Sequence, residues 1–237
     1  MRAASNISHI FKREFRVYFI SPIAYIVIAI FLVLTGWFFF STFFLYGQTE
    51  LRNFFSLLPI IFSFIVPALT MRLFSEEFNV GSYEILVTLP VTYRDIVVGK
   101  FLAAAAFVAI MMIPTLSYAV SITFLGDLDW GPVFGGYLGA ILLGASFSAV
   151  GLFASALTRN QIIAFIISMI ICFALTVIDK LLYFLPERLL GLFEYIGADY
   201  HFENVSKGII DSRDIVYFLG LIFIALYGAH LTIQERS

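Results

Sequence analysis

Charged residues are scarce in this sequence, and their scarcity excludes whole classes of protein. Only 13% of the 237 residues are charged, and 14 Lys and Arg against 16 Asp and Glu give a net charge of −2. No basic cluster exceeds a few residues, so no nucleic-acid partner is expected. In place of charge, 61% of the residues are hydrophobic, whereas soluble domains have roughly 45–50%. The composition is that of a membrane protein.

Cysteine and histidine are also rare, which limits metal and redox chemistry. The single cysteine, Cys172, excludes an intramolecular disulfide and any metal site made of several cysteines. Of the three histidines, only His201 has close acidic neighbours, Asp199 and Glu203, and we expect these polar groups to be solvated in a loop. No metal site is therefore expected in this chain.

A nucleotide-binding loop is missing as well. The only Gly-Lys pair, Gly99-Lys100, has Arg94 where a phosphate-binding loop needs its first glycine. The chain is therefore not expected to be an enzyme or to hold a cofactor, and any ATP hydrolysis would belong to another protein.

Long hydrophobic runs are abundant, and they predict six membrane-spanning helices. A helix needs roughly twenty mainly apolar residues to cross a bilayer. The expected spans are residues 22–46, 54–71, 101–125, 131–157, 161–178 and 215–233. The first run is longer than the apolar core of a signal peptide, so we expect it to be retained. Residues 1–237 would then form one all-α transmembrane domain with an outer loop at residues 179–214.

The positions of Lys and Arg predict the orientation of these spans. Six spans put both termini on the same side of the membrane, and a cytoplasmic N-terminus leaves most of the Lys and Arg residues on the inner side. This distribution agrees with the positive-inside rule. We therefore expect both termini, together with the polar segment 72–100, in the cytoplasm.

Residues 1–21 have the pattern of an amphipathic helix that lies flat in the cytoplasmic membrane interface. Apolar residues share one helical face and basic residues share the other, which would direct the cations toward lipid headgroups. The apolar face holds Ile7, Ile10, Phe11, Phe15, Tyr18 and Phe19, and the basic face holds His9, Lys12, Arg13 and Arg16. A basic flank that only fixes the topology is the alternative.

The centres of all six expected spans lack Asp, Glu, Lys and Arg. Ion-coupled carriers and channels with charged filters keep such groups at membrane depth, so both classes are disfavoured. Small residues are present instead: Gly136, Ala140, Gly144 and Ser148 recur every four positions in the fourth span. Such a stripe lets helices pack closely in lipid, and helix packing without a further mechanistic role is what we expect of it.

The polar connection between the second and third spans is unusually long. Connections between helices commonly have about two to eight residues, whereas the segment 72–100 is far longer and carries a concentration of charges. Phe74, Phe78, Ile85 and Leu89 recur near helical spacing, but Gly81 interrupts them. Two short helical pieces are therefore expected rather than one long helix.

Helix-ending and helix-capping residues follow these pieces. Pro90 would end the second piece, and Thr92 with Asp95 would cap the start of the third span. From the residues alone, two interpretations remain open for this amphipathic element. It could transmit force from a soluble partner to the spans, or it could be a solvated interfacial loop.

This region resembles the ABC transporter type-2 permease family. The family pattern has a proline-containing second span, an Arg at its inner end, a Glu, a Gly-small-x-Glu-x-Leu-x-x-x-Pro motif and a later Gly-Lys pair. The matching residues are Pro67, Met71-Arg72-Leu73, Glu76-Glu77, Gly81-Ser82-Tyr83-Glu84, Leu86, Pro90 and Gly99-Lys100. Asn79 and Ser82 depart mildly from the pattern. The likeness extends over nearly the whole chain, and residues 15–25 and 201–218 are similar to the gliding-motility-associated permease subgroup.

The resemblance implies a six-helix half-transporter of the bacterial cytoplasmic (inner) membrane. It would pair with a second permease protomer, in a homodimer or heterodimer, and bind an ABC ATPase subunit that holds ATP and Mg. The segment after the second span would be the coupling helix. Its ATPase contacts would be Glu76, Glu77, Gly81, Ser82, Glu84, Leu86 and Pro90. Members of the subgroup also work with an auxiliary membrane protein that has a large outer domain.

Three functions are compatible with these features. The first is the permease of an ATP-driven exporter. The second is a mechanotransmission module, in which the same ATP-driven bundle moves an outer partner and carries no substrate. The third is a channel that needs no ATPase. The apolar span interiors are compatible with a lipidic or bulky amphipathic cargo, and the sequence gives no further indication of the substrate.

Overall fold

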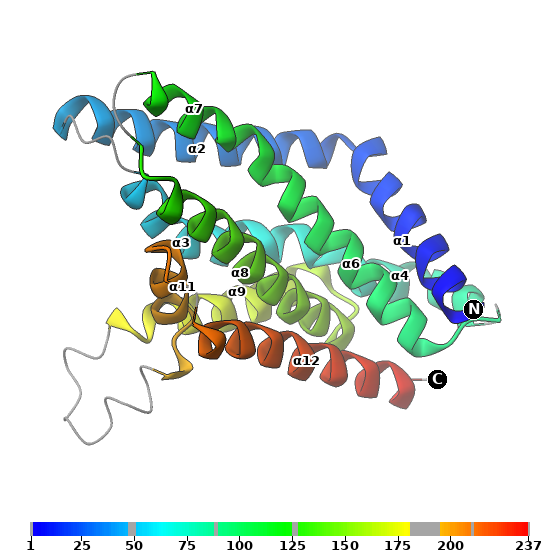
Figure 1. The fold of residues 1–237 in the computed structure, drawn as a ribbon. Coiled ribbons are helices and arrows are strands. Elements are labelled where there is room, and N and C mark those ends of the chain that lie inside the picture. The colour runs from blue at the N-terminus through cyan, green and yellow to red at the C-terminus, as the bar shows by residue number, and fades with distance from the viewer. Residues whose placement is uncertain are drawn as a thin grey trace.

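The computed structural model describes residues 2–46, 51–87, 90–124, 128–180, 195–209 and 211–236. All regular secondary structure in these ranges is helical, which confirms the all-α prediction. The longer helices run alongside one another as a bundle, and both ends of the chain lie at the same end of it (Figure 1).

The helices are as follows. The first half of the chain forms α1 (Arg2–Ile20), α2 (Pro22–Tyr46), α3 (Arg52–Thr70), α4 (Arg72–Val80), α5 (Ser82–Val87) and α6 (Tyr93–Met112). A 3₁₀ turn, η1 (Ile113–Thr115), then leads into α7 (Leu116–Thr123). The remaining helices are α8 (Trp130–Leu157), α9 (Gln161–Val177), α11 (Ala198–Ser206) and α12 (Ser212–Glu235).

Five helical stretches in the described residues are long and apolar enough to cross a membrane. They are α2, α3 with α4, α6 through α7, α8 and α12. The sixth expected span, residues 161–178, corresponds to α9, which has only 17 residues. The side chain of Asn160 caps the N-terminus of this helix, which ends at Val177. The structure therefore supports five candidate spans and one shorter apolar helix, rather than six full-length spans.

The third span has an earlier start than the sequence suggested. The Thr92 hydroxyl accepts a hydrogen bond from the backbone N–H of Asp95, and the Asp95 carboxylate accepts one from the N–H of Thr92, both at 3.2 Å. This capping box confirms the predicted cap and starts α6 at Tyr93. Residues 93–100, expected in the polar connection, are thus the first turns of α6.

Helix α8 occupies the centre of the bundle, where it contacts α3, α6, α9, α11 and α12 (Figure 1). A Cβ on Gly136 would lie 2.3 Å from the Phe55 ring, and one on Gly144 would lie 2.5 Å from Val108. Ala140 and Ser148, the other members of the small-residue stripe, are fully buried. Gly136 thus faces α3 and Gly144 faces α6 at close range, so larger side chains there would separate the helices.

Helix α1 packs its apolar face against α6. Ile10 and Tyr18 are buried, while Lys12 is exposed on the opposite face. The contact is close because α6 has a glycine there: a Cβ on Gly99 would lie 2.7 Å from Ile10 Cγ2. The apolar face of α1 thus packs against α6. The location of α1 in the membrane interface stays a prediction.

The expected outer loop, residues 179–214, contains α11, and residues 181–194 of it lie outside the described ranges. His201 is not solvated as expected. Its Nδ1 lies 2.6 Å from Asp214 Oδ1 and its Nε2 lies 3.1 Å from the Tyr195 carbonyl oxygen. The imidazole is 1% exposed and stacks on Tyr217, because α11 folds back onto α8 and α12.

Candidate functional site

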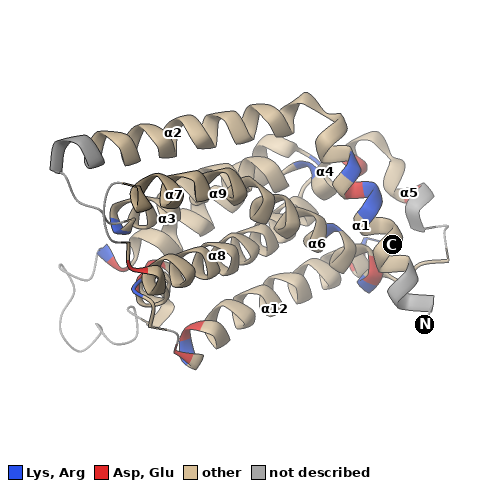
Figure 2. Cartoon of the chain, turned by 45° about the horizontal axis from the view of Figure 1, so that its top comes forward, with Lys and Arg blue, Asp and Glu red and all other residues tan. Residues whose placement is uncertain are grey.

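Charged residues gather at the two ends of the bundle, and the middle of the bundle is made of uncharged residues (Figure 2). One of these ends carries both chain termini together with α1, α4, α5 and the start of α6. This end contains the segment that the sequence singled out as a partner contact, so its geometry decides what that segment can do.

The segment begins as a direct continuation of the second span. Met71 lies between α3 and α4 with helical backbone angles, φ −52° and ψ −32°, and its N–H donates to the Pro67 carbonyl at 2.9 Å. Helix α4 then ends at Gly81, whose φ of 77° is in the left-handed region that favours glycine. Helix α5 starts at the next residue, which confirms the predicted interruption by Gly81.

A buried lysine on α6 joins three helices beside this turn. Lys100 is 1% exposed, and its Nζ donates to Glu77 Oε1 on α4 at 2.8 Å and to Glu14 Oε1 on α1 at 3.2 Å. A third hydrogen bond, at 2.8 Å, goes to the Leu73 carbonyl on α4. The ammonium also lies 5.2 Å from the centre of the Phe74 ring. All three of its N–H donors therefore have acceptors, as a buried charge requires.

Arg13 completes this charge cluster from the solvent side. Its guanidinium bonds to Glu14 and reaches Glu77 Oε1 at 3.3 Å. Burial by itself would raise the pKa of Glu14, but the adjacent charges of Lys100 and Arg13 hold that pKa below its ordinary value. Two cations and two carboxylates thus form a neutral cluster, which we call the Lys100 cluster (Arg13, Glu14, Glu77 and Lys100).

Two pockets flank the α4–α5 turn. One has a volume of about 350 Å³ and lies against α1, where Tyr18, Arg72 and Glu76 line it beside the Lys100 cluster. The other, of about 510 Å³, is lined by Glu84 of α5 and by Arg236 at the end of α12. A partner that binds the turn could therefore place its own side chains in both pockets.

The expected contact residues divide into two groups. Glu76, Gly81, Ser82 and Glu84 are exposed around the turn and are accessible to a partner. Glu77 instead points inward and belongs to the Lys100 cluster, with its side chain 19% exposed.

The last two expected contacts lie further along the segment. The backbone of Leu86 is in α5, and its side chain lies outside the described part of the structure. Pro90 is exposed between α5 and α6, and its carbonyl accepts a 3.3 Å hydrogen bond from Asn6 of α1. The start of α1 is therefore tied to the end of the segment as well.

Sequence reasoning missed the pairing of Glu14 with Lys100. A signal was present, because Ile10, Glu14 and Tyr18 recur every four residues, which places a carboxylate in the middle of an apolar helical face. Lys100 likewise follows Ile96, Val97 and Gly99, all of which are buried. Opposite charges that interrupt two apolar faces are candidates for a buried pair.

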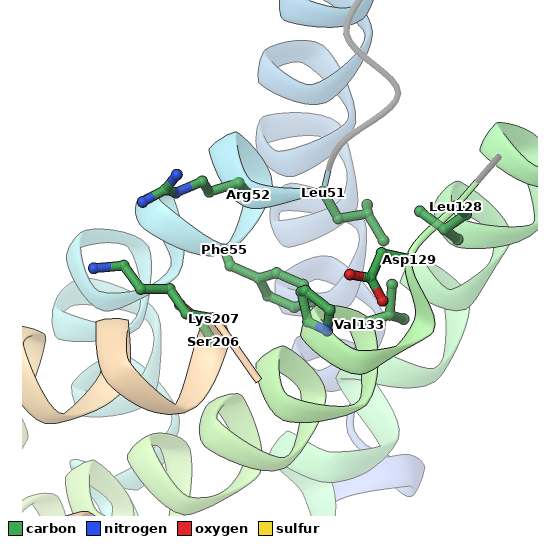
Figure 3. A pocket seen from close by; sticks show the side chains of 9 residues that line it. Leu51, Arg52, Phe55, Leu128, Asp129, Val133, Ser206 and Lys207 are labelled. Carbon is green, nitrogen blue, oxygen red and sulfur yellow. The ribbon is translucent and has the colours of Figure 1, made fainter. Parts of the chain in front are cut away.

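A smaller pocket, of about 240 Å³, lies at the opposite end of the bundle, where Phe55 and Val133 form its apolar wall (Figure 3). Arg52 and Lys207 extend to the same side of it in this view. Lys207 is paired with Glu203 at 2.8 Å, and Asp129 caps α8 through the N–H of Gly131 at 3.0 Å. The charged groups around this pocket thus largely serve the local structure.

Comparison with known families gives a match over almost the entire chain. A family model described as "ABC-2 family transporter protein" matches residues 9–233. The match includes the whole of the α4–α5 turn and all four residues of the Lys100 cluster. No curated protein matches the chain.

Proposed function

Because the chain belongs to the ABC-2 family of transporter membrane proteins, we propose that it is the permease half of an exporter that moves its substrate when a partner hydrolyses ATP. The family identifies the chain as the membrane permease component, which lacks an ATPase domain and depends on an ATPase partner. ATP and Mg bind to that partner, and hydrolysis there supplies the driving force. Export as the direction of transport, and pairing with a second permease protomer, are parts of the proposal.

The observation that carries the proposal is the position of the α4–α5 turn. It lies outside the apolar part of the bundle, at the end with both termini, and it presents Glu76, Ser82 and Glu84 to solvent. We therefore assign this turn to the ATPase contact and this end of the bundle to the cytoplasm. The membrane would then be the bacterial cytoplasmic membrane, with both termini inside the cell.

Movement of the turn would reach the spans by three direct connections. Helix α4 continues from α3, so that the second span moves with it. The N–H of Phe74 donates to Ser155 Oγ of α8 at 3.3 Å. Lys100 ties the same helix to α6 and α1. A displacement of α4 therefore acts on α1, α3, α6 and α8 together.

A mechanotransmission module remains a second candidate, and one observation favours it. Helix α11, at the end opposite the termini, is anchored by the buried His201–Asp214 pair and by packing against α8. Because α11 is firmly attached to the bundle, it is suited to transmitting motion to an auxiliary partner that has an outer domain. This is the arrangement implied by the gliding-motility subgroup, to which we propose the chain belongs.

Transport by the purified complex in vesicles separates these two functions. Substrate movement that stops when ATP is withheld would support the exporter. ATP turnover with movement of the outer partner alone would support mechanotransmission. Purification from native membranes without any nucleotide-binding subunit would contradict both and favour a channel.

Charge reversal at Glu84 tests the ATPase contact. The Glu84→Lys variant should bind the ATPase about tenfold more weakly, because a contact that accepts a carboxylate would meet a like charge. Membrane insertion should be unaffected, since Glu84 is exposed and has no ion pair among the described residues. The measurement is the dissociation constant of the permease and ATPase in detergent.

The matched control is Glu203→Lys, the same change at the opposite end of the bundle, where the side chain is 54% exposed. It should leave the dissociation constant unchanged. Equal affinities of wild type and Glu84→Lys would remove Glu84 from the contact.

A further inference from the structure

An unassigned groove lies between the start of α6 and the end of α12. Its volume is about 410 Å³. Val97 and Val98 of α6 form one apolar wall, and Phe223 and Leu226 of α12 form the other. Only 17% of the apolar part of α12 is buried, compared with 72% for α8, so the groove opens on the side of the bundle that faces outward.

The end of this groove nearest the chain termini is polar. Arg94, in the first turn of α6, is exposed and has no ion pair among the described residues. His230, near the end of α12, lines the same end of the groove. Tyr227 lines the groove next to them. Arg94 and His230 thus place two basic side chains at one end of an apolar groove, an arrangement that suits an anionic group attached to an apolar chain.

We propose that this groove binds an anionic phospholipid, with its phosphate at Arg94 and His230 and one acyl chain along the apolar walls. The order of the residues fits such a molecule. Arg94 and His230 lie toward the helix ends, whereas Val98 and Phe223 lie about one to two turns further into the bundle. Basic pockets between membrane helices at the bilayer surface select anionic headgroups in this way.

The lipid would hold α6 and α12 together at the level of the Lys100 cluster. Arg94 precedes Lys100 by less than two turns on the same helix, so the position of the start of α6 affects both sites. The proposal requires only that this end of the bundle lies at a membrane surface, and it stands whether or not the protein is an exporter.

The test uses the full-length chain in mild detergent. Phosphatidylglycerol and phosphatidylcholine with identical acyl chains are titrated separately, and bound lipid is counted by native mass spectrometry alongside the melting temperature. Both lipids carry the phosphate, but the choline cation of phosphatidylcholine is repelled by Arg94, so wild type should bind phosphatidylglycerol about tenfold more tightly. Glycerol 1-phosphate, which has the headgroup chemistry without a chain, should not raise the melting temperature at the same concentrations.

Three variants locate the site. Arg94→Gln should abolish the preference for phosphatidylglycerol, whereas Arg159→Gln, an exposed arginine at the same end in the α8–α9 connection, should retain it. Leu226→Trp fills the groove without changing its charge and should weaken binding of both lipids. This last variant keeps the test valid if removal of Arg94 impairs folding.

Several results would overturn the proposal. Equal binding of the two lipids by wild type would do so, as would a preference that survives Arg94→Gln and Leu226→Trp. Stabilisation by glycerol 1-phosphate as strong as that by the lipid would identify a site for free phosphate instead. Loss of permease pairing in Arg94→Gln, with lipid binding unchanged, would show that the groove receives a second protomer.

Discussion

Replacement of Lys100 with methionine is expected to reduce the free energy of unfolding by about 3 kcal/mol, because breaking a buried charge pair leaves its partners uncompensated. Glu14 and Glu77 would retain only the partly exposed Arg13 as a counter-charge. For a chain of this length the loss corresponds to a melting temperature lower by about 6–12 °C. Thermal unfolding of the purified permease in detergent measures it.

Two further variants identify the cause. Lys12→Met removes an exposed lysine from α1 and should change stability by less than about 0.5 kcal/mol. The triple variant Glu14→Gln, Glu77→Gln, Lys100→Met removes Lys100 together with both of its carboxylate partners and should recover most of the loss. A melting temperature for Lys100→Met equal to that of wild type would show that the cluster does not stabilise the fold.

The same triple variant separates a structural role of the cluster from a role in transmission. It should keep its fold and its ATPase partner, because the exposed residues of the α4–α5 turn are unchanged. If Lys100 passes the motion of α4 to α6, the assembled complex should transport less substrate for each ATP hydrolysed. An unchanged ratio of transport to hydrolysis would assign the cluster to stability alone.

Substitution of Gly135 by alanine is expected to cost about 2–3 kcal/mol, since the added carbon would collide with backbone rather than with a flexible side chain. Its Cβ would lie 2.3 Å from the Val205 carbonyl oxygen and 2.9 Å from the Gly208 Cα. The end of α11 would have to move away from α8. A melting temperature lower by several degrees in detergent is the expected result.

Gly220 provides the matched control, because it lies inside α12 and an added Cβ would meet nothing within 4 Å. Gly220→Ala should be neutral or stabilising by up to about 1 kcal/mol, as alanine favours the helix. Similar melting temperatures for the two alanine variants would contradict the close packing of the end of α11 against Gly135 of α8.

Local features of the fold were predictable from the sequence, because they depend on neighbouring residues. Gly81 divides the segment after the second span, and Thr92 with Asp95 caps the next helix, since a left-handed turn and a capping box each require only a few consecutive residues. The family resemblance, which depends on the same segment, is confirmed by the match over residues 9–233.

Features that depend on distant parts of the chain were predicted less well. His201 has an acidic partner 13 positions away, in a helix that folds back on it, and its sequence neighbours Asp199 and Glu203 gave no sign of this. Glu77, whose contact with a partner stays a prediction, also pairs with a lysine 23 residues later. Neither pairing follows from a periodic pattern, because each depends on how two helices meet.

The Lys100 cluster also bears on how the protein is made. A lysine near the start of an apolar helix opposes the transfer of that helix into lipid, unless a counter-charge accompanies it. Both carboxylates that bind Lys100, Glu14 and Glu77, precede it in the chain and leave the ribosome first. The order of synthesis therefore makes both carboxylates available before α6 emerges, so the third span can insert with its charge already matched.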